Sequence, residues 1–303
     1  MNDVEIKLQM YGDLLIDAPL SAHTTFKIGG KAKYFLYPKS TLGLMRVLDI
    51  AKENGLEVRI FGKGSNILAS DEDYAGLILC LDRYFSDFYF EEDGTCIAQS
   101  GTSIILLAHE AMKRELSGLE FASGIPGTLG GAVFMNAGAY KSEIRDILDK
   151  VFVLQDNNCC WLSVDELAMS YRSSIFQKQR DWIILAAKLK LSKGNGAEIR
   201  DLMDSRRQRR LASQPLNMPS AGSIFRNPEQ LPAWQCIEEV GLRGYQIGGA
   251  MVSDKHANFI VNADHASAND VIELITLIQQ KVKDKYQIEL KTEVEHFNWP
   301  KRK

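Results

Sequence analysis

The 303-residue sequence predicts an α+β fold with more than one domain. Two observations carry this prediction. A strand, a helix and a second strand follow one another over residues 33–62, which is the order of a βαβ unit. Three further strand patterns then follow at 76–82, 88–92 and 95–100 without an intervening helix, as in α+β proteins. The length is that of roughly two or three domains.

Capping signals place two of the helices. Ser40 precedes a helical pattern that ends at Gly55. Ser267 opens another pattern that continues to residue 286, with Asp270 at the spacing of a capping box. Periodicity predicts further helices at 103–116, 196–215 and 233–241, and further strands at 150–155, 182–191, 257–262 and 287–297.

Composition and charge argue against several classes of partner. Hydrophobic residues make up 45% of the sequence and charged residues 25%, as in globular proteins, and the net charge is −3. This balance attracts neither nucleic acid nor an anionic membrane. No signal peptide and no apolar run of about 18 residues is evident. The five cysteines show no CxxC spacing, which favours free thiols in a reducing cytoplasm.

Metal binding is not expected from this sequence. The five histidines show no HxH, HExxH or Cys/His cluster spacing. Each is interpreted as structural or, for His256, as a polar group that lines a site. Four arginines within 204–210 are typical of the solvated face of a helix, and a phosphate-binding role is the alternative.

Three glycine-rich segments, 26–30, 62–68 and 125–140, are the strongest sign of a ligand. None is a P-loop or a GxGxxG dinucleotide fingerprint. The third contains four glycines and no charge, so it is expected to be too interrupted for a helix and too apolar for a solvated loop. Glycine lets backbone N–H groups turn toward an anion such as a pyrophosphate. A nucleotide-type ligand and ordinary tight turns both stay open at this point.

Four polar side chains lie where a simple core pattern would not put them. Arg172 has apolar neighbours, and Ser223 lies between a glycine and an apolar pair. Glu293 and Glu295 would share one face of the last strand, because side chains alternate along a strand. A structural ion pair, a turn and a solvated strand face are the plainer interpretations. The residues alone therefore indicate a nucleotide-binding α+β enzyme whose reaction stays open.

Together these segments resemble the UDP-N-acetylenolpyruvoylglucosamine reductase family. The resemblance rests on TTFKIGG, GKGSNIL, SGIPGTLGGAVFMNAGAY, SYRSSIF, SAGSIFRNP and GGAMVSDKHANFIVN, between Thr24 and Asn262, and on TEV near the C-terminus. It implies an FAD-binding fold of the vanillyl-alcohol-oxidase/PCMH type in two subdomains, 1–79 and 80–196. A C-terminal α+β substrate-binding domain, 197–303, would follow. The short spacing from Arg172 to Ser223 resembles the compact class that lacks a tyrosine loop.

The resemblance implies an enzyme that uses NADPH and FAD to reduce an enolpyruvyl UDP-sugar to UDP-N-acetylmuramate, a peptidoglycan precursor. Glycine amides suit the pyrophosphate of FAD, and an uncharged apolar segment suits the isoalloxazine ring. The positions that match the flavin site of the family are Ile28, Gly29, Gly30, Gly62, Gly64, Ser65, Asn66, Ile125, Pro126, Gly127, Gly130, Gly131 and Asn136.

The resemblance also assigns catalytic and substrate-binding residues. Ser223 matches the acid that protonates the substrate carbon. Arg172 and Glu293 match the residues that polarise the substrate carboxyl group, through a guanidinium fork and a protonated carboxyl group. Segments that resemble substrate-binding parts contain Asn227, Arg243, Lys255 and Asn258.

Three positions depart from the family pattern. Thr292 stands where proline is usual, Glu295 where a basic residue is common, and Lys141 where glycine is favoured. The first two leave open whether Glu293 or Glu295 is catalytic. Two alternatives also stay open: another flavin oxidoreductase of the same superfamily, and a nucleotide-binding regulator without catalysis. The expected partners are the UDP-sugar and NADPH, with no nucleic acid and no membrane, and the expected state is a cytoplasmic monomer.

Overall fold

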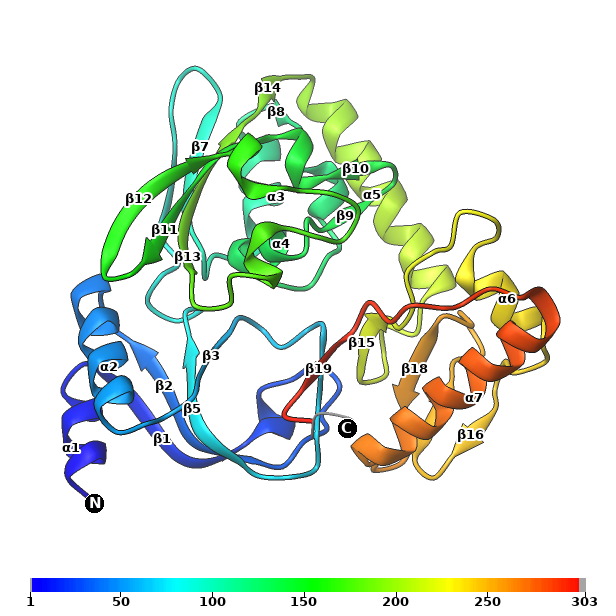
Figure 1. Ribbon diagram of the computed structural model, residues 1–303. Helices are drawn as coiled ribbons and strands as arrows, with labels where there is room; N and C mark the ends of the chain where they lie inside the picture. The colour runs from blue at the N-terminus through cyan, green and yellow to red at the C-terminus, as the bar shows by residue number, and fades with distance from the viewer. Residues whose placement is uncertain (1, 300–303) are drawn as a thin grey trace. The chain divides into compact units, whose positions relative to one another are not determined.

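The computed structural model describes residues 2–299, which form two compact units (Figure 1). The first unit contains the chain up to Ile16, Tyr34–Lys63 and Gly76–Gln208. The second contains Asp17–Lys33, Gly64–Ala75 and the chain from Arg209 onward. The two units are therefore interleaved along the sequence. The division into three contiguous domains, with boundaries at 79 and 196, stays a prediction.

The predicted βαβ unit is present near the start of the chain. The helix begins after Ser40 as predicted, because the Ser40 hydroxyl accepts a hydrogen bond from Gly43 N at 3.0 Å. The two strands of the unit are not neighbours, since β5 lies between them in a sheet of order β1-β2-β5-β3. The elements are α1 (Asp3–Gln9), β1 (Gly12–Pro19), β2 (Lys31–Pro38), α2 (Thr41–Glu53), β3 (Val58–Phe61) and β5 (Tyr74–Cys80).

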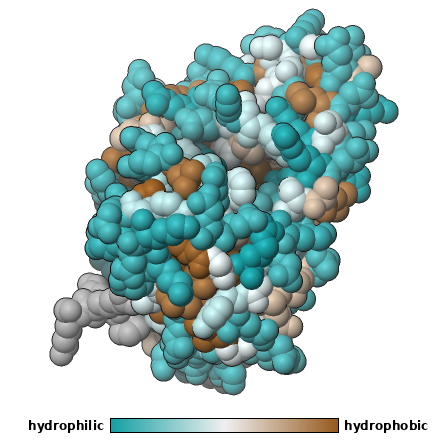
Figure 2. All heavy atoms as spheres, turned by 90° about the vertical axis from the view of Figure 1, so that its right-hand side faces the viewer, coloured by the Kyte–Doolittle hydropathy of each residue, from teal (hydrophilic) through white to brown (hydrophobic). Residues whose placement is uncertain are grey.

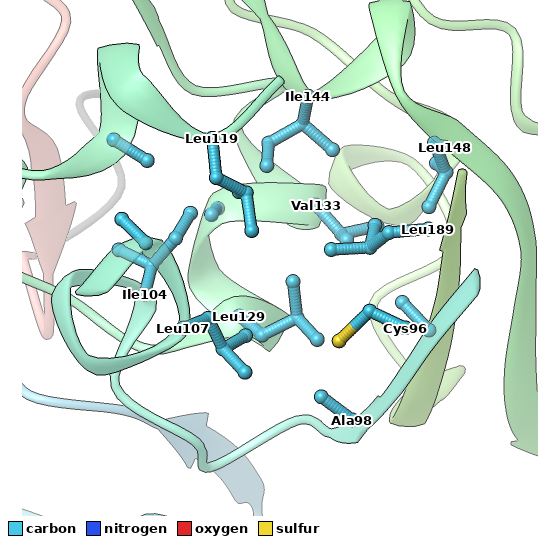
Figure 3. Packing of buried hydrophobic residues seen from close by; sticks show 14 of the residues in the cluster. Cys96, Ala98, Ile104, Leu107, Leu119, Leu129, Val133, Ile144, Leu148 and Leu189 are labelled. Atoms are coloured by element: carbon cyan, nitrogen blue, oxygen red, sulfur yellow. The ribbon is translucent and has the colours of Figure 1, made fainter. Parts of the chain in front are cut away.

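A second sheet, antiparallel and of order β12-β11-β13-β7-β6, supports the rest of the first unit. One face carries a buried apolar cluster to which α3 contributes Ile104 and Leu107 (Figure 3). The predicted strands are confirmed, and β12 was not predicted. The elements are β6 (Phe88–Phe90), β7 (Thr95–Gln99), α3 (Ile104–Lys113), β11 (Leu148–Gln155), β12 (Asn158–Ser163) and β13 (Ile183–Lys190).

The glycine-rich stretch 125–140 contains a helix, so the expectation that its glycines prevent one is wrong. α4 (Leu129–Phe134) begins after Thr128, whose hydroxyl accepts a hydrogen bond from Gly131 N at 3.3 Å. Leu129 and Val133 are fully buried and point into the cluster of Figure 3. Burial of two such side chains contributes roughly 3–6 kcal/mol. Two glycines in a helix cost only about 2 kcal/mol, so packing decides the local structure.

The second unit contains an antiparallel sheet of order β15-β18-β17-β16 and two helices that share a buried apolar cluster with it. The capping box that opens α7 is confirmed: Ser267 Oγ accepts from Asp270 N, and the Asp270 carboxylate accepts from Ser267 N. The elements are β15 (Ser220–Ser223), α6 (Ala233–Glu239), β16 (Gln246–Ile247), β17 (Ala250–Val252), β18 (Phe259–Asn262) and α7 (Ala268–Tyr286).

The long strand predicted over 287–297 is wrong. Only β19 (Glu295–Phe297) is a strand, and it pairs in parallel with β4 (Ile67–Ala69). Upstream, Thr292 forms an isolated bridge with Phe225 instead. The segment thus passes from one pairing partner to another with a bend at Val294. The alternation that would put Glu293 and Glu295 on one face does not extend across that bend.

The helix predicted before Pro215 is confirmed as α5 (Gly196–Ser213). Arg207 and Arg209 are exposed, as the interpretation of a solvated face predicts. The Arg206 guanidinium lies over the Tyr140 ring, 4.7 Å from its centroid. The remaining short strands are β8 (Leu116–Ser117), β9 (Gly138–Ala139), β10 (Ser142–Glu143) and β14 (Ser192–Lys193), and the 3₁₀ turns are Leu20–Ala22, Glu120–Ala122, Ile144–Asp146, Val164–Leu167 and Ile175–Gln177.

The face drawn in Figure 2 is mostly hydrophilic, with apolar residues scattered between charged and polar ones. Within residues 2–299, no helix combines the length and the apolar character that crossing a membrane requires. Over the same residues, His, Cys, Asp and Glu side chains do not gather in groups of three that could hold a metal ion.

Candidate active site

Two of the predicted flavin segments meet in the first unit. A Cβ built on Gly62 would lie 2.5 Å from Thr128 Oγ1, so the backbone that follows β3 lies directly against the start of α4. Ile125, Pro126 and Gly127 lead into this helix, and Gly127 O accepts a hydrogen bond from Ile104 N at 3.3 Å. Any larger residue at position 62 would separate the two segments.

Two adjacent glycines in α4 have different surroundings. Gly130 N donates to Ser100 O at 2.7 Å, and a Cβ on Gly130 would lie 2.9 Å from Ser100 Cβ. Gly130 is therefore required by packing within the protein. Gly131 is exposed, and the nearest atom to a Cβ built there is Thr128 Oγ1 at 3.6 Å, an ordinary contact. Nothing within the protein demands glycine at 131, where bare backbone is presented outward.

Asn136 follows α4 and is fully buried. Its side chain Nδ2 donates to Ser170 O at 3.0 Å, and its Oδ1 accepts from Arg145 N at 3.0 Å. The amide thus holds together three parts of the first unit. The predicted contact of Asn136 with the flavin stays a prediction, because its polar side-chain atoms already have protein partners.

Arg172 lies at the tip of a tight turn in which Ser170 and Ser173 exchange two backbone hydrogen bonds. Its φ of 53° is in the left-handed region, which is unfavourable for a residue with a long side chain. Nη2 donates to Gly138 O at 2.7 Å, and Gln177 Nε2 binds the Arg172 carbonyl at 3.0 Å. Lys27 and Lys141 also have a positive φ, so the backbone conformation alone does not mark Arg172 as functional, and its predicted role stays a prediction.

The first flavin segment, 26–30, meets the rest of the second segment, which begins at Gly64, in the second unit. Gly64 has a φ of 61°, and a Cβ there would lie 2.2 Å from His23 O, so only glycine fits. Gly30 N donates to Ser70 O at 2.9 Å, and a Cβ on Gly29 would lie 2.7 Å from Ala69 Cβ. Residues 28–30 are thereby packed against the chain that follows Gly64, Ser65 and Asn66.

Ser223 ends β15 immediately after a β-bulge. Ser220 pairs with Val261 and Ser223 with Phe259, so three steps on β15 oppose two steps on β18. Gly222 supplies the extra residue with a φ of 78°. A bulge re-aims the side chain beside it, and bulges are common next to active sites. Ser223 is half-buried, which leaves its hydroxyl near the surface of the unit.

Glu293 lies beside the Ser223 segment. Glu293 N donates to Ile224 O at 2.7 Å, and Arg226 N donates to Lys291 O at 2.9 Å. These bonds place Glu293 alongside the residue that follows Ser223. Glu295 instead belongs to β19, where its register partner is Ile67. The structure therefore puts the backbone of Glu293 next to the residue that follows Ser223 and pairs Glu295 with β4, and which of the two glutamates is catalytic stays a prediction.

Two side chains connect the flavin segments of the second unit to the catalytic segments. Asn66 Nδ2 donates to Glu293 O at 3.1 Å, and Asn66 O accepts from Glu295 N at 2.9 Å. Thr25 Oγ1 donates to Ser220 O at 2.7 Å. Thr25 was not singled out in the sequence, where its only signal was its place in TTFKIGG. Its hydroxyl fixes the start of β15.

The predicted substrate-binding residues are all in the second unit and have protein partners. Arg243 Nη2 binds Glu238 Oε2 at 2.6 Å, and Arg243 Nη1 donates to Asp254 O. Lys255 Nζ donates to Leu211 O at 3.4 Å, and both cations are exposed. Asn227 Oδ1 accepts from Ala233 N at 3.1 Å, at the start of α6. Asn258 differs from the other three because it is buried.

His256 helps to shape the loop before β18. Its Nδ1 accepts a hydrogen bond from Asn258 N at 3.3 Å, and its ring packs edge-on against Phe259 with centroids 5.0 Å apart. Burial, and secondarily the charge of Arg243, lowers the pKa of the imidazole below its usual 6.5. A neutral ring suits this position, because a protonated Nδ1 cannot accept the bond.

Comparison with known proteins gives the family. Residues 214–297 match the sequence model described as "UDP-N-acetylenolpyruvoylglucosamine reductase, C-terminal domain", and residues 32–158 match the one described as "FAD binding domain". The UDP-N-acetylenolpyruvoylglucosamine reductase of Anoxybacillus flavithermus is 46% identical over 277 residues, 91% of each chain. The protein of that name from Bacillus subtilis is 41% identical over 292 residues, 96% of each chain. The chain belongs to the UDP-N-acetylenolpyruvoylglucosamine reductase family.

Solved structures agree with this family and its fold. The reductase of Thermus caldophilus superimposes with a TM-score of 0.79 at 32% identity and covers 94% of this chain and 98% of its own. The BBE-like 1 protein of Physcomitrella patens matches 63% of this chain and 45% of its own at 10% identity and a TM-score of 0.51, which shows the fold alone. The fold is the FAD-binding fold of the vanillyl-alcohol-oxidase/PCMH type, as predicted.

A chain of this family with an FAD-binding domain is an FAD-dependent oxidoreductase. The alternative of a nucleotide-binding regulator without catalysis is therefore wrong. One feature of the structure fits the flavin. Gly131 is exposed and presents bare backbone that packing within the protein does not require. Such backbone is suited to close approach by a nucleotide pyrophosphate.

The two glycines of α4 provide a matched test of whether the outward face of this helix contacts the flavin. Gly131→Val is expected to fold like the parent and to purify with little flavin, because the side chain would fill space outside the protein. Gly130→Ala is expected to lower the melting temperature, because its Cβ would overlap Ser100. Flavin absorbance per protein and thermal unfolding of the flavin-free proteins measure the two effects. Full flavin retention by Gly131→Val would exclude this face of α4 from the cofactor site.

The neutral His256 predicts a loss of stability in mild acid. Its pKa is lowered on folding, so the unfolded chain takes up the proton first as pH falls. The stabilisation is complete above about pH 6.5 and is lost as pH falls toward the folded pKa. His256→Gln keeps an acceptor that does not titrate. The melting temperature of the parent should therefore fall more between pH 7 and pH 5 than that of the variant, and parallel curves would contradict this.

Proposed function

We propose that this chain reduces UDP-N-acetylenolpyruvoylglucosamine to UDP-N-acetylmuramate in peptidoglycan precursor synthesis, with NADPH as hydride donor through FAD. Support comes from reductases of that name that are 41–46% identical over nearly the whole chain. The observation in the structure that carries the proposal is the bond from Glu293 N to Ile224 O at 2.7 Å. It places a carboxyl-bearing residue alongside the segment that carries the Ser223 hydroxyl.

The reaction sets two tasks for the residues of the protein. Hydride adds to the terminal carbon of the enolpyruvyl double bond, and the electron pair moves toward the conjugated carboxylate. The protein must stabilise that negative charge and then deliver a proton to the inner carbon. When bound, FAD supplies the hydride that NADPH has delivered to it.

Ser223 performs the proton transfer in this proposal. A serine hydroxyl is a weak acid, but a carbanionic carbon is a stronger base, so a positioned hydroxyl suffices. The bulge at Gly222 supports this role, because it sets the direction of the Ser223 side chain independently of the regular alternation of β15. A donor fixed by backbone geometry loses little entropy when the substrate arrives.

Arg172 and Glu293 stabilise the developing charge in this proposal. The planar guanidinium of Arg172 matches a carboxylate in two-pronged geometry. Glu293 supplies a hydrogen-bonding group to the enolate oxygen, held by the bonds of its own backbone to Ile224 and Asn66.

The remaining assignments complete the proposal. Arg243 and Lys255, both exposed cations, suit the diphosphate of the UDP-sugar. Asn227, which we also assign to the substrate site, accepts a hydrogen bond from Ala233 N at the start of α6. We also propose a monomer in the cytoplasm, organised as three domains with boundaries at 79 and 196. The five cysteines, all within the described residues, are free thiols, which supports a reducing compartment.

One assay tests the function directly. The flavin-loaded protein should oxidise NADPH only when UDP-N-acetylenolpyruvoylglucosamine is present, with one UDP-N-acetylmuramate formed for each NADPH consumed. Absorbance at 340 nm and mass spectrometry of the sugar nucleotide measure the two quantities. A yellow protein that ignores this substrate would instead be another flavin oxidoreductase of the same superfamily.

The two glutamates are expected to differ sharply. Glu293→Gln should lower turnover by about 10² or more, because the charge-stabilising group beside Ser223 is altered. Glu295→Gln should change turnover little, because Glu295 lies in β19, paired with β4. Steady-state turnover of both variants at saturating substrate makes the comparison, and the reverse ranking would show that Glu295 is the catalytic residue.

Ser223→Ala separates the two half-reactions. Bleaching of the flavin by NADPH should stay near the parental rate, because no proton to carbon is needed there. Reoxidation by the enolpyruvyl sugar should slow by roughly 10²–10⁴, as expected when a positioned acid is lost. Stopped-flow absorbance follows both steps. Equal slowing of both would mean a general disturbance of the site, and normal reoxidation would remove Ser223 from the mechanism.

A further inference from the structure

Asn258 is a buried asparagine whose two polar side-chain atoms are both bonded to the backbone of Phe225. Its side chain is 3% exposed. Nδ2 donates to Phe225 O at 2.8 Å, and Oδ1 accepts from Phe225 N at 3.0 Å. The main-chain oxygen of Asn258 accepts from Ile224 N at 2.8 Å. One residue therefore binds three of the four polar backbone groups of Ile224 and Phe225, and Glu293 N binds the fourth, Ile224 O.

The bonds from the Asn258 side chain take the place of β-sheet pairing with β18, which does not extend beyond Ser223. β18 begins at Phe259, which is the register partner of Ser223, and before Phe259 the chain turns away into the loop of His256. Without another partner, the backbone N–H and C=O groups of residues 224–225 that face β18 would have no hydrogen bonds. The amide of Asn258 carries a donor and an acceptor, as a peptide group does, and so continues the pairing beyond the end of β18.

The same two residues support Glu293 from their other side. Glu293 N donates to Ile224 O at 2.7 Å, and Thr292 forms a bridge with Phe225. Residues 224–225 thus lie between Asn258 on one side and the Glu293 segment on the other. Ser223 is attached to this pair covalently and Glu293 by a hydrogen bond, so a displacement of the pair moves both.

We propose that Asn258 is a positioning residue, which holds Ser223 and Glu293 in their relative placement through the backbone of Ile224 and Phe225. This inference rests on the proposed function and replaces the direct substrate contact that the resemblance implied for Asn258. Both polar atoms of its side chain are bonded to the Phe225 backbone, and the residue is only 3% exposed, which leaves little of the amide open to a ligand. We call the two hydrogen bonds between the Asn258 side chain and Phe225 the clamp. Loss of the clamp is expected to slow proton transfer to carbon without weakening substrate binding.

Asn258→Asp is the informative variant because it can be rescued by acid. An ionised carboxylate keeps the acceptor for Phe225 N but lacks the donor to Phe225 O and is repelled by that carbonyl. A protonated carboxyl group has one donor and one acceptor and restores both bonds. The reoxidation rate should therefore fall on the order of 10²-fold at pH 8 and recover as the pH is lowered.

Other ionisable groups near Asn258 are present in parent and variant alike. They are His256, which accepts from Asn258 N, Arg226, which follows Phe225, and Glu293, bonded to Ile224. The rate ratio of variant to parent, measured at each pH, removes their contributions. Three further quantities are measured for each protein. Stopped-flow absorbance gives the rate of flavin bleaching by NADPH, and the flavin absorbance per protein gives the flavin content. The change that UDP-N-acetylmuramate causes in the flavin spectrum gives its dissociation constant.

Asn262→Asp is the matched control. Asn262 lies at the other end of β18, and its amide likewise uses both atoms, Nδ2 to Phe26 O at 3.3 Å and Oδ1 from Ala266 N at 2.8 Å. It does not contact residues 223–225. The reoxidation rate of the Asn262→Asp variant, per bound flavin, should equal that of the parent at every pH. Asn258→Leu, which cannot regain either bond, should be slow at every pH.

The outcomes separate the proposal from its rivals. Slow reoxidation that acid restores, with normal bleaching and an unchanged dissociation constant, is the expected result. A raised dissociation constant at normal rate would make Asn258 a substrate ligand, and equal loss of both half-reactions would make it merely structural. Amide hydrogen exchange of residues 224–225, faster in Asn258→Leu, tests the clamp without any substrate. If the parent does not use the enolpyruvyl sugar, the proposed function fails while this exchange result still decides whether the clamp exists.

Discussion

Hydrogen bonds to the backbone of Ser220–Phe225 are the constraint on which the proposed chemistry depends. Thr25 binds the carbonyl of Ser220, Asn258 binds the backbone of Phe225, and Glu293 binds Ile224. These three partners come from widely separated parts of the sequence. A serine hydroxyl is useful as an acid only when its position is fixed, and here that position is set by main-chain contacts on both sides of the strand.

The predicted flavin segments come together by the same physical means within each unit. Close backbone approach, without matching cations, brings glycine segments together at Gly62 and Thr128 in one unit and at Gly29 and Ala69 in the other. The short helix α4 is held by apolar burial on its inner side, as Figure 3 shows for Leu129 and Val133. Its outward side can then carry glycine, because the inner side already supplies the stability.

The sequence predicted those elements whose signals are local. Ser40 and Ser267 cap their helices where expected, because a cap needs only residues within one turn. It failed where distant contacts override local preference. α4 forms despite two glycines because Leu129 and Val133 reach a core built from distant strands. The strand over 287–297 breaks at Val294 because Thr292 and Glu295 pair with different strands.

The catalytic assignments depended on resemblance, and the structure adds what resemblance could not supply. Glu293 and Glu295 are two residues apart, and alternation alone made them equivalent. Their pairing partners, Ile224 and Ile67, distinguish them. The supporting contacts of Asn258 could not be predicted either, because an asparagine in the predicted strand 257–262 shows nothing of the residue 33 positions away that it binds.

The parallel pair β4 and β19 has a consequence for how the chain is made. Residues 67–69 emerge from the ribosome long before their partners at 295–297. This pair of strands therefore cannot form until residue 297 has been synthesised, and residues 67–69 wait until then without their native partner. Such long sequence separation slows folding and lengthens exposure of apolar surface. Removal of residues 295–297 would accordingly leave residues 67–69, which were synthesised much earlier, without their strand partner.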